Sequence, residues 1–128
     1  MKKQAGFTLI ELVAVLVILA LLGAMAVPRF SDMQDDALTA AKQGSAMAVK
    51  SAHSIAIAKL KRLPTVLELA GYVGGESTIT AVNNGIQVTI NGDDYVVQTY
   101  TDSTCSSPTT ATTGAPGADV NCVGSVTP

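Results

Sequence analysis

An uncharged apolar run close to the N-terminus constrains this chain more than any other feature. From Leu12 to Pro28 the sequence has 17 residues without a charged side chain. The wider apolar segment 7–27 has 21 residues, about 31 Å as a helix at ~1.5 Å per residue, which matches a bilayer core of roughly 30 Å. Lys2 and Lys3 precede the segment, so the extreme N-terminus is predicted to stay cytoplasmic. The segment is therefore predicted to enter a membrane as a helix.

A single acidic residue inside this segment limits how the segment can be used. The apolar run alone fits a plain membrane anchor, or a cleaved secretory signal that ends at Ala24-Met25-Ala26 and leaves Val27 as the first mature residue. Glu11 argues against both, because a carboxylate costs on the order of 2.5–3.5 kcal/mol at the membrane centre and less near the helix end. An acid in a membrane segment predicts a functional residue with an ionic partner.

The residues around this acid form a specific motif. The sequence begins Met1-Lys2-Lys3-Gln4-Ala5-Gly6 and continues Phe7-Thr8-Leu9-Ile10-Glu11-Leu12. It resembles the type IV pilin and pseudopilin family, whose members carry a short basic leader ending in Gly, then Phe, Thr, Leu, Ile or Val, Glu and an apolar helix. Every position of the motif matches. The resemblance implies that prepilin peptidase cleaves between Gly6 and Phe7 at the cytoplasmic face, and that Phe7 is N-methylated.

Cleavage at that bond would create the partner that Glu11 needs. It exposes an α-amino cation at Phe7, four residues before Glu11 and at a similar depth in the membrane. When a new subunit docks, the amine of Phe7 can pair with Glu11 of a neighbouring subunit and neutralise a buried charge. A buried ion pair also fixes register. Phe7 and Glu11 are therefore the predicted assembly site.

Two residues interrupt the apolar helix. Gly23 weakens a helix interior by about 1 kcal/mol relative to alanine, and Pro28 removes a hydrogen bond and clashes with the preceding turn. Pro28 could simply end the membrane helix, whereas in pilins a proline at the matching position bends a continuous helix. We expect a bend at Pro28 and, in the assembled filament, a locally extended stretch between Gly23 and Pro28. The sequence Pro28-Arg29-Phe30, followed by Met33-Gln34-Asp35-Asp36-Ala37, resembles the mannose-sensitive haemagglutinin group of type IVa pilins.

A second, amphipathic helical segment is predicted over residues 29–63, ended by Pro64. Its small apolar residues recur in steps of three and four, which predicts a narrow stripe that packs on a β-sheet. The stripe consists of Phe30, Met33, Ala37, Ala41, Gly44, Ala48, Ala52 and Ile55. Ser31 followed by Gln34 fits a capping box if the helix restarts after Pro28. We expect the stripe to form the core of the C-terminal part.

The C-terminal half has the alternation and the turns of a small antiparallel sheet. A short helical turn is predicted within residues 64–73, and a three-stranded meander over about residues 77–101. Asn84-Gly85 is a hairpin signal. The next strand places Ile86, Val88 and Ile90 on one face. The predicted fold class is therefore α+β, with a long N-terminal helix packed on a small antiparallel sheet.

The two cysteines lie in a Ser/Thr/Gly-rich stretch in which we expect order to fall, from Asp102 onward. Beside a membrane-directed N-terminus, Cys105 and Cys122 predict a disulfide formed in an oxidising compartment, and two unpaired thiols in a cytosolic protein are the alternative. Closing the 16-residue loop between them stabilises a fold by about 3 kcal/mol in the chain-entropy model. Pilins commonly carry such a loop on the fibre surface, so the resemblance implies an exposed disulfide-bounded loop over residues 105–122.

The resemblance also implies an organisation and a set of partners. It divides the chain into a leader 1–6, a transmembrane and fibre-core helix 7–28, and a pilin head 29–128. The implied partners are other copies of the chain in a homopolymeric fibre, prepilin peptidase, and the inner-membrane assembly platform with its ATPase machinery. The implied location is first the inner membrane, with a single span and a cytoplasmic N-terminus. After assembly it is an extracellular pilus, or fimbrium.

Two functions fit these observations. The first is a pilin that polymerises into a type IV pilus for adhesion, aggregation or motility. The alternative is a pseudopilin of a type II secretion system that forms a periplasmic pseudopilus. The cysteine pair and Glu11 favour the pilin, because the major pseudopilin usually uses calcium in its C-terminal loop.

Composition and motifs bear on other classes of function. The net charge of −2, from 8 basic and 10 acidic residues, gives no reason to expect a nucleic-acid partner. The sequence has no phosphate-binding glycine loop, nucleophile elbow or cysteine spacing typical of a metal site. His53, the single histidine, is expected to face solvent or to pack. We therefore expect no catalytic residue, no metal and no cofactor.

Overall fold

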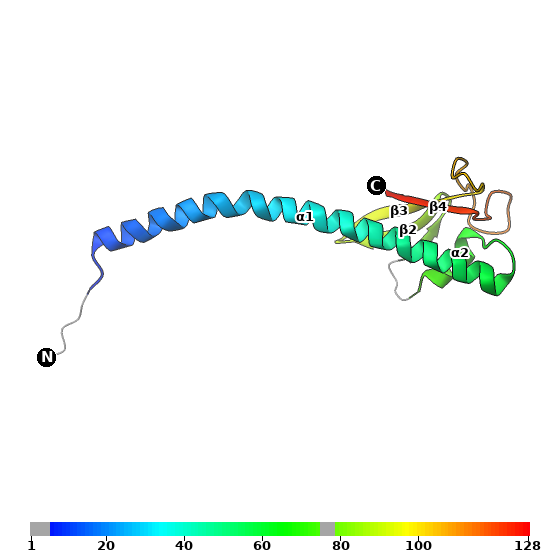
Figure 1. Ribbon diagram of the computed structural model, residues 1–128, viewed down its shortest axis with the longest axis horizontal. Coiled ribbons are helices and arrows are strands. Elements are labelled where there is room, and N and C mark those ends of the chain that lie inside the picture. The colour runs from blue at the N-terminus through cyan, green and yellow to red at the C-terminus, as the bar shows by residue number, and fades with distance from the viewer. Residues whose placement is uncertain (1–5, 75–78) are drawn as a thin grey trace. The chain divides into compact units, whose positions relative to one another are not determined.

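The computed structural model describes residues 6–74 and 79–128, and of Pro28 only the backbone. The elements along the chain are helices α1 (Leu9–Leu60) and α2 (Val66–Val73) and strands β1 (Ile79–Val82), β2 (Gly85–Ile90), β3 (Asp93–Tyr100) and β4 (Cys122–Thr127) (Figure 1). The residues up to Ala37 form one compact unit, and Leu38–Pro128 forms a second. The predicted α+β class, a long helix with a small antiparallel sheet, is confirmed.

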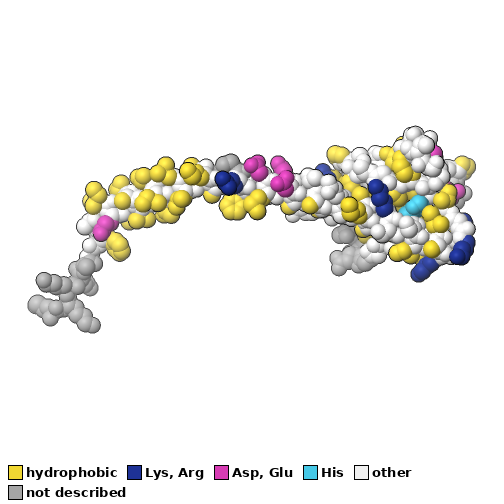
Figure 2. Space-filling view, viewed as in Figure 1, with side chains coloured by type: hydrophobic (Ala, Val, Ile, Leu, Met, Phe, Trp, Pro, Cys, Tyr) yellow, Lys and Arg dark blue, Asp and Glu magenta, His cyan; other side chains and the backbone are white. Residues whose placement is uncertain are grey.

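The first part of α1 is an apolar helix whose side chains are exposed. Helical backbone runs without a break from Leu9 to Leu60, across both Gly23 and Pro28. The most apolar stretch of α1 is long enough to cross a membrane, and none of it is buried within the chain. Figure 2 shows hydrophobic side chains along this part of the helix, followed by acidic ones. Such a surface is unusual for a protein in water and marks a membrane or protein contact.

The C-terminal part of α1 packs on the sheet through a stripe that differs from the predicted one. The buried residues described in α1 are Val49, Ala52 and Ala56. Val49 and Ala52 pack with apolar residues of α2 and the sheet. Of the predicted stripe, Gly44, Ala48 and Ile55 are exposed, and Ile55 keeps 49% of its surface. The predicted stripe was therefore wrong for most of its positions, because alanines lie all round this helix and do not mark one face.

The turn between the helices is held by a cap. Lys61 adopts a left-handed φ of 58°, so α1 ends at Leu60 rather than continuing to the predicted residue 63. Thr65 then caps α2: its hydroxyl accepts from the backbone of Glu68, and the Glu68 side chain accepts from the backbone of Thr65. This reciprocal pair satisfies two backbone donors at the helix start. The predicted helical turn after Pro64 is confirmed as α2.

The sheet is an antiparallel meander in the order β1-β2-β3-β4. The predicted hairpin is confirmed, but its turn consists of Asn83 and Asn84, because Gly85 pairs with Val82 and is the first residue of β2. The next turn consists of Asn91 and Gly92, whose φ values of 59° and 96° are those of a tight hairpin turn that favours Asn-Gly. The inward face of β2 and β3 carries the buried side chains Ile86, Val88, Tyr95 and Val97. The first strand begins at Ile79, and the predicted start near residue 77 lies outside the described residues.

The sheet has a fourth strand that the sequence analysis did not predict. β4 pairs with β3, with Val126 opposite Val97 and Cys122 opposite Tyr100. The register shifts between Val97 and Thr99, where the pairing is irregular. The expected three-stranded sheet is thus a four-stranded one, and β4 forms one of its edges.

The segment 101–121 is held to the head by hydrogen bonds, contrary to the expected loss of order after Asp102. The buried hydroxyls of Thr99 and Thr109 lie 2.7 Å apart, and the Thr109 amide donates to the Thr99 carbonyl at 2.9 Å. Further along, the Val120 amide donates to the Pro64 carbonyl at 2.8 Å. Backbone pairing of this kind orders a segment that has few apolar side chains.

Candidate assembly and processing site

The predicted cleavage bond lies immediately before the first helix. Gly6, Phe7 and Thr8 precede α1 and are not helical. Gly6 is exposed, and Phe7 keeps 92% of its surface. A protease needs an accessible, non-helical bond, and the Gly6–Phe7 bond has both properties. Cleavage there and N-methylation of Phe7 stay predictions.

Thr8 and Glu11 form a capping box at the start of α1. The Glu11 amide donates to the Thr8 hydroxyl at 3.3 Å, and the Thr8 amide donates to Glu11 Oε2 at 2.9 Å. The Thr8 hydroxyl also donates to Glu11 Oε2 at 2.9 Å. The sequence analysis missed this box, although the Thr-x-x-Glu spacing is its signature. The condition for the capping box at Ser31 and Gln34, a helix that restarts after Pro28, is not met, because α1 runs through these residues without interruption.

This arrangement leaves part of the Glu11 carboxylate available. Both hydrogen bonds from Thr8 end on Oε2, and within residues 6–74 and 79–128 no hydrogen bond to Oε1 is found. A carboxylate has about four acceptor positions, so Oε1 can receive a further donor. An apolar hollow of about 470 Å³, lined by Phe7, Glu11, Leu12, Ala14 and Val15, lies beside it. The site therefore offers one free anionic oxygen beside an apolar surface.

Gly23 and Pro28 lie apart from this site, within the helical stretch of α1. Proline has no amide hydrogen, so the carbonyl of Ala24 cannot receive the usual helical hydrogen bond from residue 28. The backbone is nevertheless helical at both positions. The expected bend and local extension there stay a prediction.

Cys105 and Cys122 form a disulfide with their Cα atoms 5.5 Å apart, so the predicted loop is closed by a covalent bond. One acid organises the start of this loop: Asp102 accepts from the Thr104 hydroxyl and from the amides of Ser106 and Ser107, the latter at 2.7 Å. The Thr104 hydroxyl, with the two amides, lowers the pKa of Asp102 to about 2. The charged form of Asp102 is thus part of the loop's structure.

A second acid is held at the start of α2. Arg62 donates to both oxygens of Glu68, at 3.0 and 2.5 Å. The hydrogen bonds from Arg62, and then the amide of Thr65, lower the pKa of Glu68 to about 2. The same pairing raises the pKa of Arg62. Glu68 therefore serves the helix cap and the ion pair together, a role that sequence analysis did not assign to it.

His53 connects α1 to the C-terminal loop. Its Nε2 lies 2.8 Å from the carbonyl oxygen of Val120, and its side chain is half-buried. Val120 is in turn bonded through its amide to Pro64. The histidine thus packs against the loop, which agrees with one of its two expected roles.

Comparisons with known proteins agree with the motif. Residues 1–27 match the family described as the prokaryotic N-terminal methylation motif. The chain is 44% identical over 93 residues to the type IV narrow pilus major component PilA5 of Thermus thermophilus, an alignment that covers 70% of this chain and 80% of that protein. No solved structure matches significantly. The long helix, the small sheet and the N-terminal motif define a fibre-forming class of protein. This chain belongs to the type IV pilin family.

Proposed function

We propose that this chain is a structural, non-enzymatic subunit that prepilin peptidase cleaves after Gly6 and that polymerises into a type IV pilus. The observation that carries the proposal is the apolar helical surface of α1, which is exposed from Leu9 onward and carries Glu11 at its start. A single chain in water cannot cover that surface, whereas a membrane or a bundle of such helices can. The relative PilA5 is a major pilus component, which supports the same assignment.

The route to the fibre follows from the same surface. Before assembly the apolar N-terminal part of α1 spans the inner membrane once, with the N-terminus in the cytoplasm. Assembly on the platform with its ATPase then moves the subunit into an extracellular fibre. The new amine of Phe7 donates to Glu11 of a neighbouring copy, at the Oε1 atom that Thr8 leaves open. That pair neutralises the one acid of the apolar helix start while the helix leaves the lipid.

The test is to shear cells that make the chain and to identify the bulk protein of the released fibres. The expected result is that this chain is the principal subunit, and that deleting its gene removes the fibres while protein secretion continues. Finding the chain only in the cell envelope, with secretion lost on deletion, would establish the type II secretion pseudopilus instead.

A further inference from the structure

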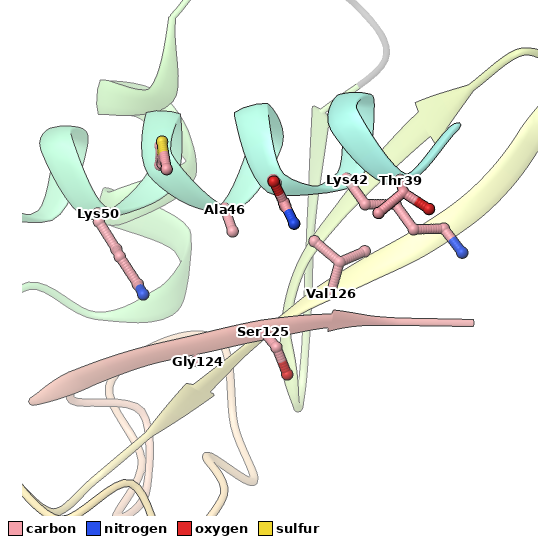
Figure 3. A pocket seen from close by; sticks show the side chains of 9 residues that line it. Thr39, Lys42, Ala46, Lys50, Gly124, Ser125 and Val126 are labelled. Carbon is pink, nitrogen blue, oxygen red and sulfur yellow. The ribbon is translucent and has the colours of Figure 1, made fainter. Parts of the chain in front are cut away.

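A groove lies along the head between α1 and the edge strand β4. It encloses about 320 Å³ and is lined on the helix by Lys42, Ala46 and Lys50 and on the strand by Gly124 and Val126. Figure 3 shows the Lys50, Ala46 and Val126 side chains in the space between the helix and the strand. Because β4 is the last strand of the sheet, no further strand closes this side.

The helix side of the groove carries two cations. Lys42, Ala46 and Lys50 follow one another at intervals of four residues, so they share one face of α1. The ammonium of Lys42 lies 4.2 Å from the centre of the Tyr95 ring, which holds the cation in place while leaving its N–H donors open. Among the described residues, the ion pair found joins Arg62 to Glu68, and neither groove lysine takes part in one.

Beside the two lysines, the groove has apolar lining from Ala46, Met47 and Val126 and uncharged polar lining from Thr39, Gln43 and Ser125. Ala46 on the helix and Val126 on the strand are apolar, and Met47, which also lines the groove, keeps 67% of its surface exposed. An occupant that fits must therefore combine acidic side chains, which pair with the lysines, and apolar side chains, which contact Ala46 and Val126.

The same chain carries a segment with this combination. Asp32, Asp35 and Asp36 lie within five residues of α1, and Asp32 and Asp36 share a helix face. Phe30 and Met33 are each 66% exposed on the same segment. Asp32 and Asp36 are about 6 Å apart along the helix at ~1.5 Å per residue, and the two lysines about 12 Å, a difference that flexible lysine stems can cover.

We propose that the groove of Lys42, Lys50 and Val126 binds the acidic helical segment 30–36 of a second copy of this chain. The proposal rests on the proposed function, since a polymer brings copies together in a fixed register. The groove then acts as a contact in the head, additional to the one at Phe7 and Glu11. Its charge complementarity selects which stretch of the neighbouring helix lies against β4.

Charge reversal in the full-length chain tests the contact in cells. Lys50→Glu and Asp36→Lys each place like charges opposite one another, so the amount of subunit in sheared fibres is expected to fall by about fivefold or more while the membrane pool stays unchanged. The double variant Lys50→Glu with Asp36→Lys restores the attraction and is expected to recover most of the fibre yield. Lys50 is exposed, so its reversal leaves the fold intact.

Lys61→Glu is the matched control, because Lys61 is an exposed lysine outside the groove. It is expected to leave the yield unchanged. An equal loss with Lys61→Glu, or rescue of Asp36→Lys by Lys61→Glu in place of Lys50→Glu, overturns the proposal. Normal yield from both groove reversals also overturns it.

A covalent readout gives the register directly. Fibres of the variant with both Asp36→Cys and Lys50→Cys are expected to show a ladder of cross-linked subunits after oxidation, and fibres of either single variant are not. If wild-type fibres contain the chain but fibres of the double-cysteine variant show no ladder, the groove proposal is wrong and the proposed function is not affected. If wild-type fibres do not contain the chain, the proposed function is wrong as well. If Ser125→Pro abolishes assembly while the charge-reversal variants assemble normally, β4 binds an added strand of a neighbouring subunit. That result would exclude the helical segment 30–36 as the occupant of the groove.

Discussion

At the scale of single residues, Glu11 has an observed role in the helix cap and a proposed role in assembly. One oxygen of its carboxylate closes the capping box with Thr8, and the other is the atom that we propose accepts from the amine of a neighbouring subunit. Capping needs an acceptor but no charge, since glutamine serves at this position as well. Assembly needs the charge. A change that removes the charge and keeps the acceptor therefore isolates the assembly role.

Glu11→Gln is expected to leave the subunit inserted and cleaved, and to lower the fibre yield by more than about tenfold because the Phe7 amine of the neighbour loses its counter-ion. Subunit in the sheared fraction and in the membrane is measured by immunoblot. The matched control is Thr8→Val, which removes the hydroxyl of the cap and keeps the acid. Normal yield from Glu11→Gln would show that the cap alone explains this residue.

Two acids of the head predict how its stability depends on pH. Glu68 and Asp102 both have a pKa of about 2 in the folded chain, against ordinary values of 4.5 and 3.8. A lowered folded pKa stabilises the fold above the ordinary value, and that stability is lost as the pH falls toward the folded value. The thermal midpoint in detergent should therefore drop between about pH 4.5 and pH 2. Solvent reaches both acids, so the drop is modest.

The double variant Glu68→Gln with Asp102→Asn is the control for this effect. It should have a lower midpoint than the wild-type chain at pH 7 and a flatter midpoint across the acid range. An identical acid slope in the two proteins would assign the loss of stability to other carboxylates.

At the scale of elements, the sheet has glycines at positions where another strand's backbone or side chain approaches closely. A Cβ at Gly85 would collide with the carbonyl oxygen of Val97, where β2 meets β3. A Cβ at Gly124 would lie 2.6 Å from the ring of Tyr100. Glycine within a strand commonly marks such an approach. By contrast, the exposed Gly71 of α2 has open space around it.

Gly85→Ala is therefore expected to destabilise the head by about 2 kcal/mol or more, because backbone atoms have to move apart. Gly71→Ala, the matched control, is expected to stabilise it by about 0.5–1 kcal/mol through helix propensity. Denaturant unfolding of the two variants in the same detergent measures both changes. Equal stability of the two would contradict the close approach at Gly85.

The same elements show why some features could be predicted and others could not. The alternation of β2 and the Asn-Gly pairs carry local signals strong enough to place the first three strands. β4 was missed because Gly124 and Ser125 break its alternation, and the need for a glycine there depends on Tyr100, 24 residues away in the sequence. The helix stripe was misplaced because alanine surrounds α1, and the side chains of the sheet select which face is buried.

The functional site likewise contains features that could be predicted from the sequence and features that could not. The motif from Gly6 to Glu11 is local, and its residues were identified from sequence without the structure. The Thr8 cap of Glu11 has a sequence signature, the Thr-x-x-Glu spacing, whereas the ion pair of Arg62 with Glu68 has no local sequence signal and required coordinates. The groove beside β4 could not have been found either, since the strand that forms it was not predicted.

At the scale of the whole molecule, the chain combines two units with different requirements. The head, Leu38–Pro128, has its own apolar core, built around Val49, Leu69 and Val97, and is closed by the disulfide. None of the most apolar stretch of α1 is buried by the residues that the structure describes. Its large apolar side chains must therefore be covered by lipid or by other subunits. A subunit that is held in a membrane and then assembles into a fibre needs both properties: a head that is stable by itself and an apolar helix that lipid or other subunits can cover.

The N-terminus of the subunit in sheared fibres tests this account most directly. Mass spectrometry of the fibre protein should give a chain of residues 7–128 that begins with N-methylated Phe7 and retains the Cys105–Cys122 bond. A mature chain that begins at Val27 would show a cleaved secretory signal, and one that begins at Met1 would show an uncleaved anchor. Either result would contradict the assignment of Glu11 and the apolar helix to fibre assembly.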